Sequence, residues 1–71
     1  AQTAQRYQPL TQSSNPRIRS LAHQQLGVLS NRESKLEEAL AHFKQALKAD
    51  AANEDARFNY EMVKKKLEEQ K

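Results

Sequence analysis

Two histidines, His23 and His42, are the side chains of this 71-residue chain best suited to bind a metal or to move a proton. They fall in two successive segments with helical periodicity. A zinc site usually needs three or more protein ligands, and outer groups that orient them. The chain has no cysteine and offers no clear third ligand, so we expect neither a metal site nor a cofactor.

The carboxylates and serines also lack a catalytic arrangement. Glu37 and Glu38 are adjacent, so on a helix they point about 100° apart and cannot act as a facing pair of carboxylates. Ser30 and Ser34 stand in no nucleophile motif, and the single glycine, Gly27, cannot form a phosphate-binding loop. We therefore expect no enzymatic activity and no small-molecule substrate.

The composition favours one small all-α domain. The chain is 37% hydrophobic and 30% charged, with one Gly and two Pro, and strand patterns are missing. No stretch of eighteen apolar residues occurs, so we expect no direct membrane insertion. The first residue is Ala1 rather than methionine, which suggests a processed protein or a fragment of a longer chain, and we expect the fragment.

The net charge of +3 is unevenly distributed. Arg17 and Arg19 lie in an acid-free first part of the chain, and the run 64–66 is all lysine. Acids flank this run on the same predicted helix, at Glu61 and Glu68. This pattern is typical of a solvated helix face. A small basic helical nucleic-acid-binding domain stays open as an alternative function, and so does a homo-oligomerisation element.

Residues 1–15 are predicted to form a loose N-terminal segment, with a short turn or a loose helix. The segment is rich in Gln, Ser and Thr, and Pro9 interrupts any helix that begins near Ala4. Tyr7 and Leu10 are its only large apolar side chains, and they either dock on the domain or stay free.

Three helices are predicted in the single domain 16–71. The first, 16–31, begins at Asn15-Pro16, a favourable cap followed by proline at the first helical position. Its inward stripe is Ile18, Ala22, Leu26 and Leu29, and Leu21, Gln24 and Val28 form a second strip beside it.

The second predicted helix is 35–49. Ser34 and Glu37 have the spacing of a capping box, and loss of Ser34 should then cost about 1 kcal/mol. Its apolar stripe is Leu36, Leu40, Phe43 and Leu47, with Ala39 and Ala46 beside it.

The third predicted helix, 54–69, follows the cap residue Asn53. Its inward stripe is Ala56, Tyr60, Val63 and Leu67. Phe58 and Met62 lie off this stripe. They either cover the junction with the first helix as part of the core or form a partly exposed apolar strip.

The packing residues of the first two helices resemble those of the tetratricopeptide repeat. Leu26, Gly27, Ala39, Phe43 and Ala46 match its leucine-glycine pair, its alanines and its aromatic in one register. One repeat would run over 20–53, and a second would begin at residue 54, with Tyr60 at a leucine position and Glu61 at the glycine position. The chain departs from the family pattern at His23, Ser30, Ser34 and Ala51.

This resemblance implies an antiparallel helical hairpin of one repeat plus a C-terminal capping helix, acting as a scaffold for protein–protein interaction. The family binds a peptide or helix on a concave face lined by the first helix of each repeat. That face corresponds here to Gln24, Val28, Asn31, Asp55, Phe58, Asn59, Met62 and Lys65. The lysine and asparagine with which some members hold a C-terminal carboxylate are replaced by Gln24 and Val28, so a chaperone-tail clamp is not expected.

A second resemblance rests on a shorter segment. The stretch 56–61, A-R-F-N-Y-E, is similar to tetratricopeptide proteins of bacterial von Willebrand A-domain aerotolerance operons. This would imply the periplasmic side of a bacterial envelope, and otherwise the cytoplasm is expected. Because three helices leave apolar stripes uncovered, we also expect weak self-association through Phe58 and Met62 or by exchange of the third helix.

Overall fold

The computed structural model describes residues 2–70 and contains helices but no strand within that range. The elements are α1 (Gln2–Tyr7), the 3-10 helix η1 (Gln8–Gln12), α2 (Pro16–Arg32), α3 (Leu36–Ala49) and α4 (Glu54–Glu69). The all-α class is confirmed. The limits of the three predicted helices differ from these by no more than one residue at either end.

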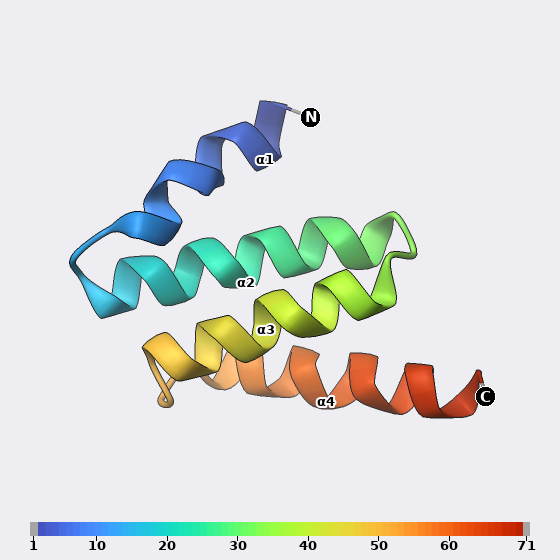
Figure 1. The fold of residues 1–71 in the computed structure, drawn as a ribbon. Helices are drawn as coiled ribbons and strands as arrows, with labels where there is room; N and C mark the ends of the chain where they lie inside the picture. Colours follow the sequence, from blue (N-terminus) through green and yellow to red (C-terminus); the bar gives the residue numbers. More distant parts are fainter. Residues whose placement is uncertain (1, 71) are drawn as a thin grey trace.

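Helices α2, α3 and α4 are each antiparallel to the next along the chain (Figure 1). The N-terminal helices lie across α2 on the side away from α4. The Cα positions extend over 37 × 28 × 13 Å, so the molecule is a thin slab. Each helix therefore contacts mainly its neighbours in sequence, as in a repeat protein.

The N-terminal segment is helical over residues 2–12 and packs against α2. The α-helix ends at Tyr7, two residues before Pro9, and the chain continues as a 3-10 helix in which the proline is tolerated. Asn15 then caps α2, because its Oδ1 accepts from the Arg17 amide at 2.9 Å, as predicted. Residue 1 lies outside the described range.

The turn between α2 and α3 differs from the prediction. Ser34 has a φ of 62°, and its side chain accepts no hydrogen bond from the first turn of α3, whose N-cap is Lys35 without a side-chain hydrogen bond. Instead the amides of Ser34 and Lys35 donate to the carbonyls of Asn31 and Ser30, the arrangement that closes a helix C-terminus through a left-handed residue. The predicted capping box with Glu37 is therefore wrong, since Ser34 terminates α2 and its left-handed backbone is incompatible with the extended conformation of an N-cap.

The crossing of α2 and α3 depends on Gly27 and Phe43. A Cβ placed on Gly27 would lie 2.5 Å from Cε1 and 2.7 Å from Cδ1 of the Phe43 ring. The space above the glycine is thus filled by the aromatic ring rather than by the facing alanine, Ala39. Phe43 is itself 1% exposed, so the ring has little freedom to move aside.

The core continues from this crossing to α4. Ala39, Phe43 and Val63 form its centre, surrounded by the partly buried side chains of Val28, Leu36, Leu40, Tyr60 and Leu67. On α2, Ala22 and Leu26 are buried as predicted, but Ile18 is 39% exposed. Ile18 lies in the first turn of the helix, where the end of the slab is open to solvent.

A partly buried chain of hydrogen bonds ties the three helices together at one end of the slab. The Ser20 hydroxyl donates to the carbonyl of Ala46 at 2.8 Å and accepts from Asn53 Nδ2 at 2.9 Å. The Oδ1 of Asn53 caps α4 by accepting from the Ala56 amide at 3.1 Å. Asn53 therefore sets both the start of α4 and its position against α2.

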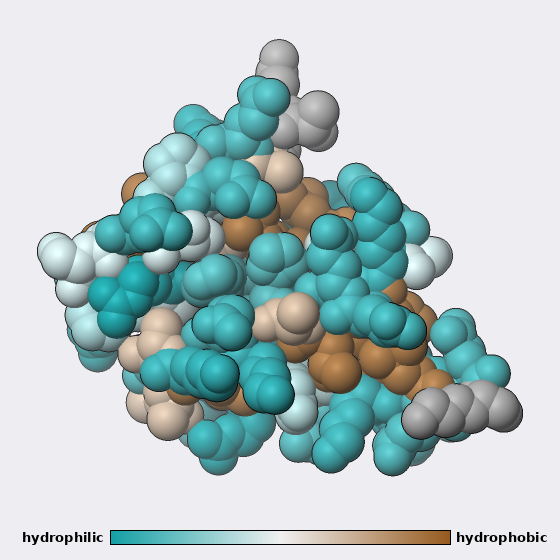
Figure 2. All heavy atoms as spheres, viewed as in Figure 1, coloured by the Kyte–Doolittle hydropathy of each residue, from teal (hydrophilic) through white to brown (hydrophobic). Residues whose placement is uncertain are grey.

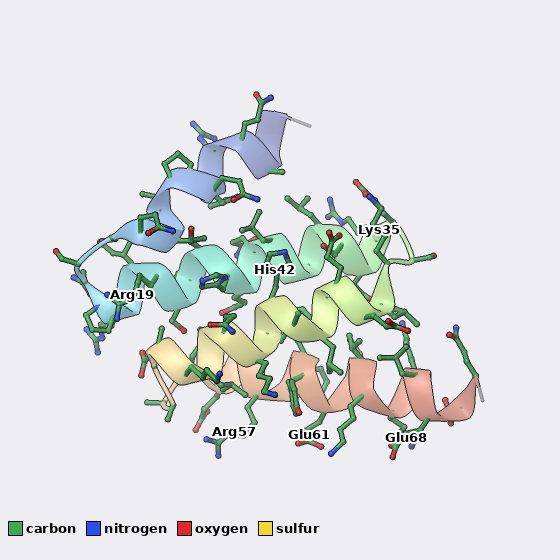
Figure 3. The ribbon with its side chains drawn as sticks, in the orientation of Figure 1. Arg19, Lys35, His42, Arg57, Glu61 and Glu68 are labelled. Atoms are coloured by element: carbon green, nitrogen blue, oxygen red, sulfur yellow. The ribbon has the colours of Figure 1, made fainter. Side chains whose placement is uncertain are left out.

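One side of α4 carries charged residues. Arg57, Glu61 and Glu68 share this side and extend away from α3 (Figure 3). All three are exposed. Glu61 stands at the place where the family resemblance expects a glycine, so this side favours solvent over a closely packed further helix.

We expect Gly27→Ala to lower stability by about 1–3 kcal/mol, because the new methyl overlaps a buried ring. At an open helix position the same change would raise stability by about 1 kcal/mol. Thermal unfolding followed by circular dichroism shows whether Gly27→Ala lowers or raises the stability. Gly27→Leu should be worse, and Phe43→Leu in the Gly27→Ala background should recover part of the loss. A higher midpoint for Gly27→Ala would contradict the assigned contact.

Ser34→Gly should raise stability by about 0.5–1 kcal/mol. A left-handed residue with a Cβ costs about 1–2 kcal/mol, and the greater freedom of glycine in the unfolded chain offsets part of the gain. Lys35→Gly is the matched control, since Lys35 has a φ of −90° and should only lose stability. Denaturant unfolding compares the two, and a destabilised Ser34→Gly variant would count against the left-handed turn.

Candidate functional site

The face predicted for partner binding lies along α2 and α4, which contact each other directly. Its side chains differ in exposure. Asp55, Phe58 and Lys65 are exposed, Val28, Asn31, Asn59 and Met62 are partly buried, and Gln24 is buried. The predicted residues thus include both accessible side chains and one, Gln24, that belongs to the packed layer beneath them.

Two large apolar side chains on α2 and α4 are left exposed. Phe58 is 68% exposed, which excludes the interpretation of this residue as core. Leu21 is 55% exposed and was not among the residues predicted for the face. Leu21 lies three residues before Gln24 and seven before Val28, so it is on the same strip of the helix. This spacing could have identified Leu21 as part of the face.

A hollow of about 480 Å³ lies where α2 and α4 begin. Its lining comes from the first turns of both helices and the loop before α4, namely Arg17, Leu21, Asp50, Ala52, Asn53, Glu54 and Asp55. Three acids and one arginine surround the apolar side chain of Leu21. This end of the face therefore combines an apolar anchor point with a net negative charge.

The opposite end of the face has a second hollow, of about 380 Å³. It is lined by Asn31, Ser34, Leu36, Lys66, Glu69 and Gln70. Lys65 and Lys66 are exposed in this last part of α4. The face therefore runs from an acidic end to an end that carries lysines.

Two side-chain amide oxygens on α2 have no hydrogen-bond partner. Gln24 Oε1 and Asn31 Oδ1 are both buried and unpaired among the described residues. A buried acceptor without a donor costs about 1–3 kcal/mol, and native structures contain few of them. Both residues belong to the predicted partner-binding face, and they lie two helical turns apart on α2.

The basic residues of the alternative nucleic-acid function are not gathered on one surface. Arg19 donates from Nη1 to the Ser13 carbonyl at 2.8 Å, and Arg17 lines the acidic hollow. Lys64, Lys65 and Lys66 are consecutive on α4 and so point in directions about 100° apart. No observation in the described structure favours nucleic-acid binding.

The structure brings His23 and His42 together across the α2–α3 interface. Their ring centroids are 5.9 Å apart, with 33° between the ring planes. Figure 3 shows His42 reaching from α3 toward α2. Burial lowers the pKa of His23, with smaller contributions from His42 and Arg19. Burial also lowers the pKa of His42, against an opposing effect of the Glu38 carboxylate.

In the described part of the chain, no group of three or more His, Cys, Asp or Glu side chains could hold a metal ion. None of its helices combines the length and apolarity that a bilayer crossing needs. Apolar side chains also gather between α3 and α4 toward the C-terminus (Figure 2), where Leu40 and Leu67 line a hollow of about 490 Å³.

Comparisons with protein-family models, with curated proteins and with solved structures found no match to this chain.

Stability should fall as the pH is lowered through the histidine range. Because the pKa of both histidines is lower in the folded chain, the unfolded chain binds protons more readily. Full stability is then present above the unfolded value of about 6.5 and is lost as the pH falls toward the folded values. Thermal unfolding midpoints recorded between pH 7.5 and 5.5 measure this loss of stability. His42→Gln should reduce the slope, and an unchanged slope would count against the buried pair.

Proposed function

We propose that this chain is a tetratricopeptide-like interaction module that binds a peptide or helix of a partner protein along α2 and α4, with no catalytic activity of its own. The observation that carries the proposal is the coincidence on one face of exposed apolar side chains and unpaired amide oxygens. Leu21 and Phe58 are exposed on this face, and Gln24 and Asn31 have no hydrogen-bond partner for their side-chain oxygens.

The apolar side chains would provide most of the affinity. Removing apolar area from water yields about 25 cal/mol per Å², and aromatic side chains dominate many protein interfaces. Leu21 borders the hollow at the start of the helices, and Phe58 follows Asp55, which lines the same hollow, by one turn. A partner with two apolar side chains on one edge would cover both.

The polar groups would select the orientation of the partner. The acidic end, with Asp50, Glu54 and Asp55, favours a basic partner segment, and the lysines at the other end of α4 favour an acidic one. A small rotation of the Asn31 side chain would let its oxygen accept from a backbone amide of the partner. This would relieve the cost of leaving that oxygen unpaired.

The resemblance supports the same location for the site. The face that it implies on α2 and α4 is the one on which exposed Phe58 and unpaired Gln24 and Asn31 occur. The absence of a lysine–asparagine pair on α2 favours internal peptide segments over a terminal carboxylate.

The proposal can be tested with a random peptide library displayed on phage and selected on the immobilised 71-residue chain. Selected peptides should bind wild type and lose at least tenfold in affinity for Leu21→Ser/Phe58→Ser, measured by fluorescence anisotropy. Leu10→Ser is the control, because Leu10 is 42% exposed but belongs to η1, which packs on a different side of α2.

Two results would contradict the proposed site. One is the selection of peptides whose binding is lost equally in the Leu10→Ser variant. The other is retention of full affinity by the double variant, provided that its circular dichroism spectrum and thermal midpoint match those of wild type.

A further inference from the structure

One side of α4 carries an acid, two apolar side chains and a base in linear order. Asp55, Phe58, Met62 and Lys65 are spaced by three, four and three residues, so they form a single strip along the helix. Asp55, Phe58 and Lys65 are exposed, with Phe58 at 68%, and Met62 is partly buried. We call these four residues the α4 strip.

The α4 strip is separate from the other two sides of the helix. Ala56 and Val63 are buried and Val63 packs in the core with α3. Arg57, Glu61 and Glu68 occupy the solvated side (Figure 3). The apolar part of the strip is therefore flanked by charges at its two ends, and its Phe58 side chain is mostly left open to solvent.

The order of residues in the strip is self-complementary. Asp55 and Lys65 each lie five residues from position 60, and Phe58 and Met62 each lie two residues from it. Glu54 and Lys66 each lie six residues from position 60, so they share this symmetry, although each is turned about 100° from its neighbour in the strip and lies at its edge. If two α4 helices are placed antiparallel about this point, the acids of one face the lysines of the other, and each Phe58 faces a Met62.

We infer that a second copy of this chain docks on the α4 strip, forming a two-fold symmetric dimer with antiparallel α4 helices. A parallel arrangement would place acids against acids and lysines against lysines, and would align the helix dipoles unfavourably. The contact between Phe58 and Met62 is of the aromatic–thioether type that favours association. Charge and shape thus specify one orientation.

We expect the dimer to be weak, because its interface is small. A helix of 16 residues is about 24 Å long, and one of its sides buries far less than the roughly 800 Å² per partner of a standard stable interface. Its charge pairs are solvent-exposed, so added salt should weaken it. All four residues of the α4 strip also belong to the face of the proposed function, so dimerisation and partner binding would compete. The dimer itself does not require that function.

Sedimentation equilibrium of the full 71-residue chain, from micromolar to millimolar, tests the dimer. The apparent mass should rise from 8.2 kDa toward twice that value. Glu54→Lys/Asp55→Lys places lysines against lysines, and Lys65→Glu/Lys66→Glu places acids against acids, so each variant alone should remain monomeric. An equimolar mixture of the two should recover dimerisation, because every cross pair is then attractive.

Arg57→Glu/Lys64→Glu is the matched control, since this double substitution changes the net charge by the same amount as Lys65→Glu/Lys66→Glu but on the solvated side of α4, and it should dimerise like wild type. Circular dichroism at micromolar concentration checks that each variant is folded. A monomeric wild-type chain at millimolar concentration would overturn the inference. An equimolar mixture of the two charge variants that stays monomeric would also overturn it. So would charge variants that dimerise as strongly as wild type, a result that exchange of α4 between chains would produce. Failure of the peptide selection would leave these outcomes unaffected.

Discussion

The close approach of Gly27 to the Phe43 ring is the contact on which the arrangement of the helices depends. It fixes the separation of α2 and α3, because a Cβ at Gly27 would lie 2.5 Å from the ring. The same approach brings His23 and His42 to a centroid distance of 5.9 Å and encloses Ala39 and Phe43 with Val63 of α4. A wider crossing would open the core of a chain whose size leaves only a small stability margin.

The position of α4 is set by polar contacts as well as by this core. Ser20 links the end of α3 to Asn53, and Asn53 caps α4 in turn. The buried Ser20 hydroxyl both donates and accepts in this chain, and full satisfaction is the condition under which buried polar groups orient helices rather than destabilise them. The face along α2 and α4 follows from this orientation, since α4 is held beside α2 at its first turn.

In contrast to this well-satisfied end, the middle and the C-terminal turn of α2 contain groups that cost stability. Gln24 and Asn31 carry buried oxygens without partners, and His23 has an unpaired buried Nδ1. Phe58 and Leu21 remain exposed on the same side as the two amides. Such departures from full satisfaction tend to concentrate at functional surfaces, where binding supplies the missing contacts. This is the physical basis for placing partner binding and self-association on this face.

The sequence alone determined the all-α class, the three helices and most of the core. Periodicity identified Phe43, Ala46, Ala56 and Val63 as buried, and local chemistry identified the caps Asn15 and Asn53, because these features act over a few residues. The tertiary structure decided what depends on residues distant in sequence. It left Phe58 outside the core. The role of Ser34 is local, because hydrogen bonds within five residues end α2 there, and the sequence prediction chose the other local role that a serine can have at a turn. The tertiary structure also buried Ser20 as a link between helices. A serine can lie at the surface or in the interior, and it is stable in the interior only where hydrogen-bond partners from other helices reach it, so its position depends on the tertiary structure.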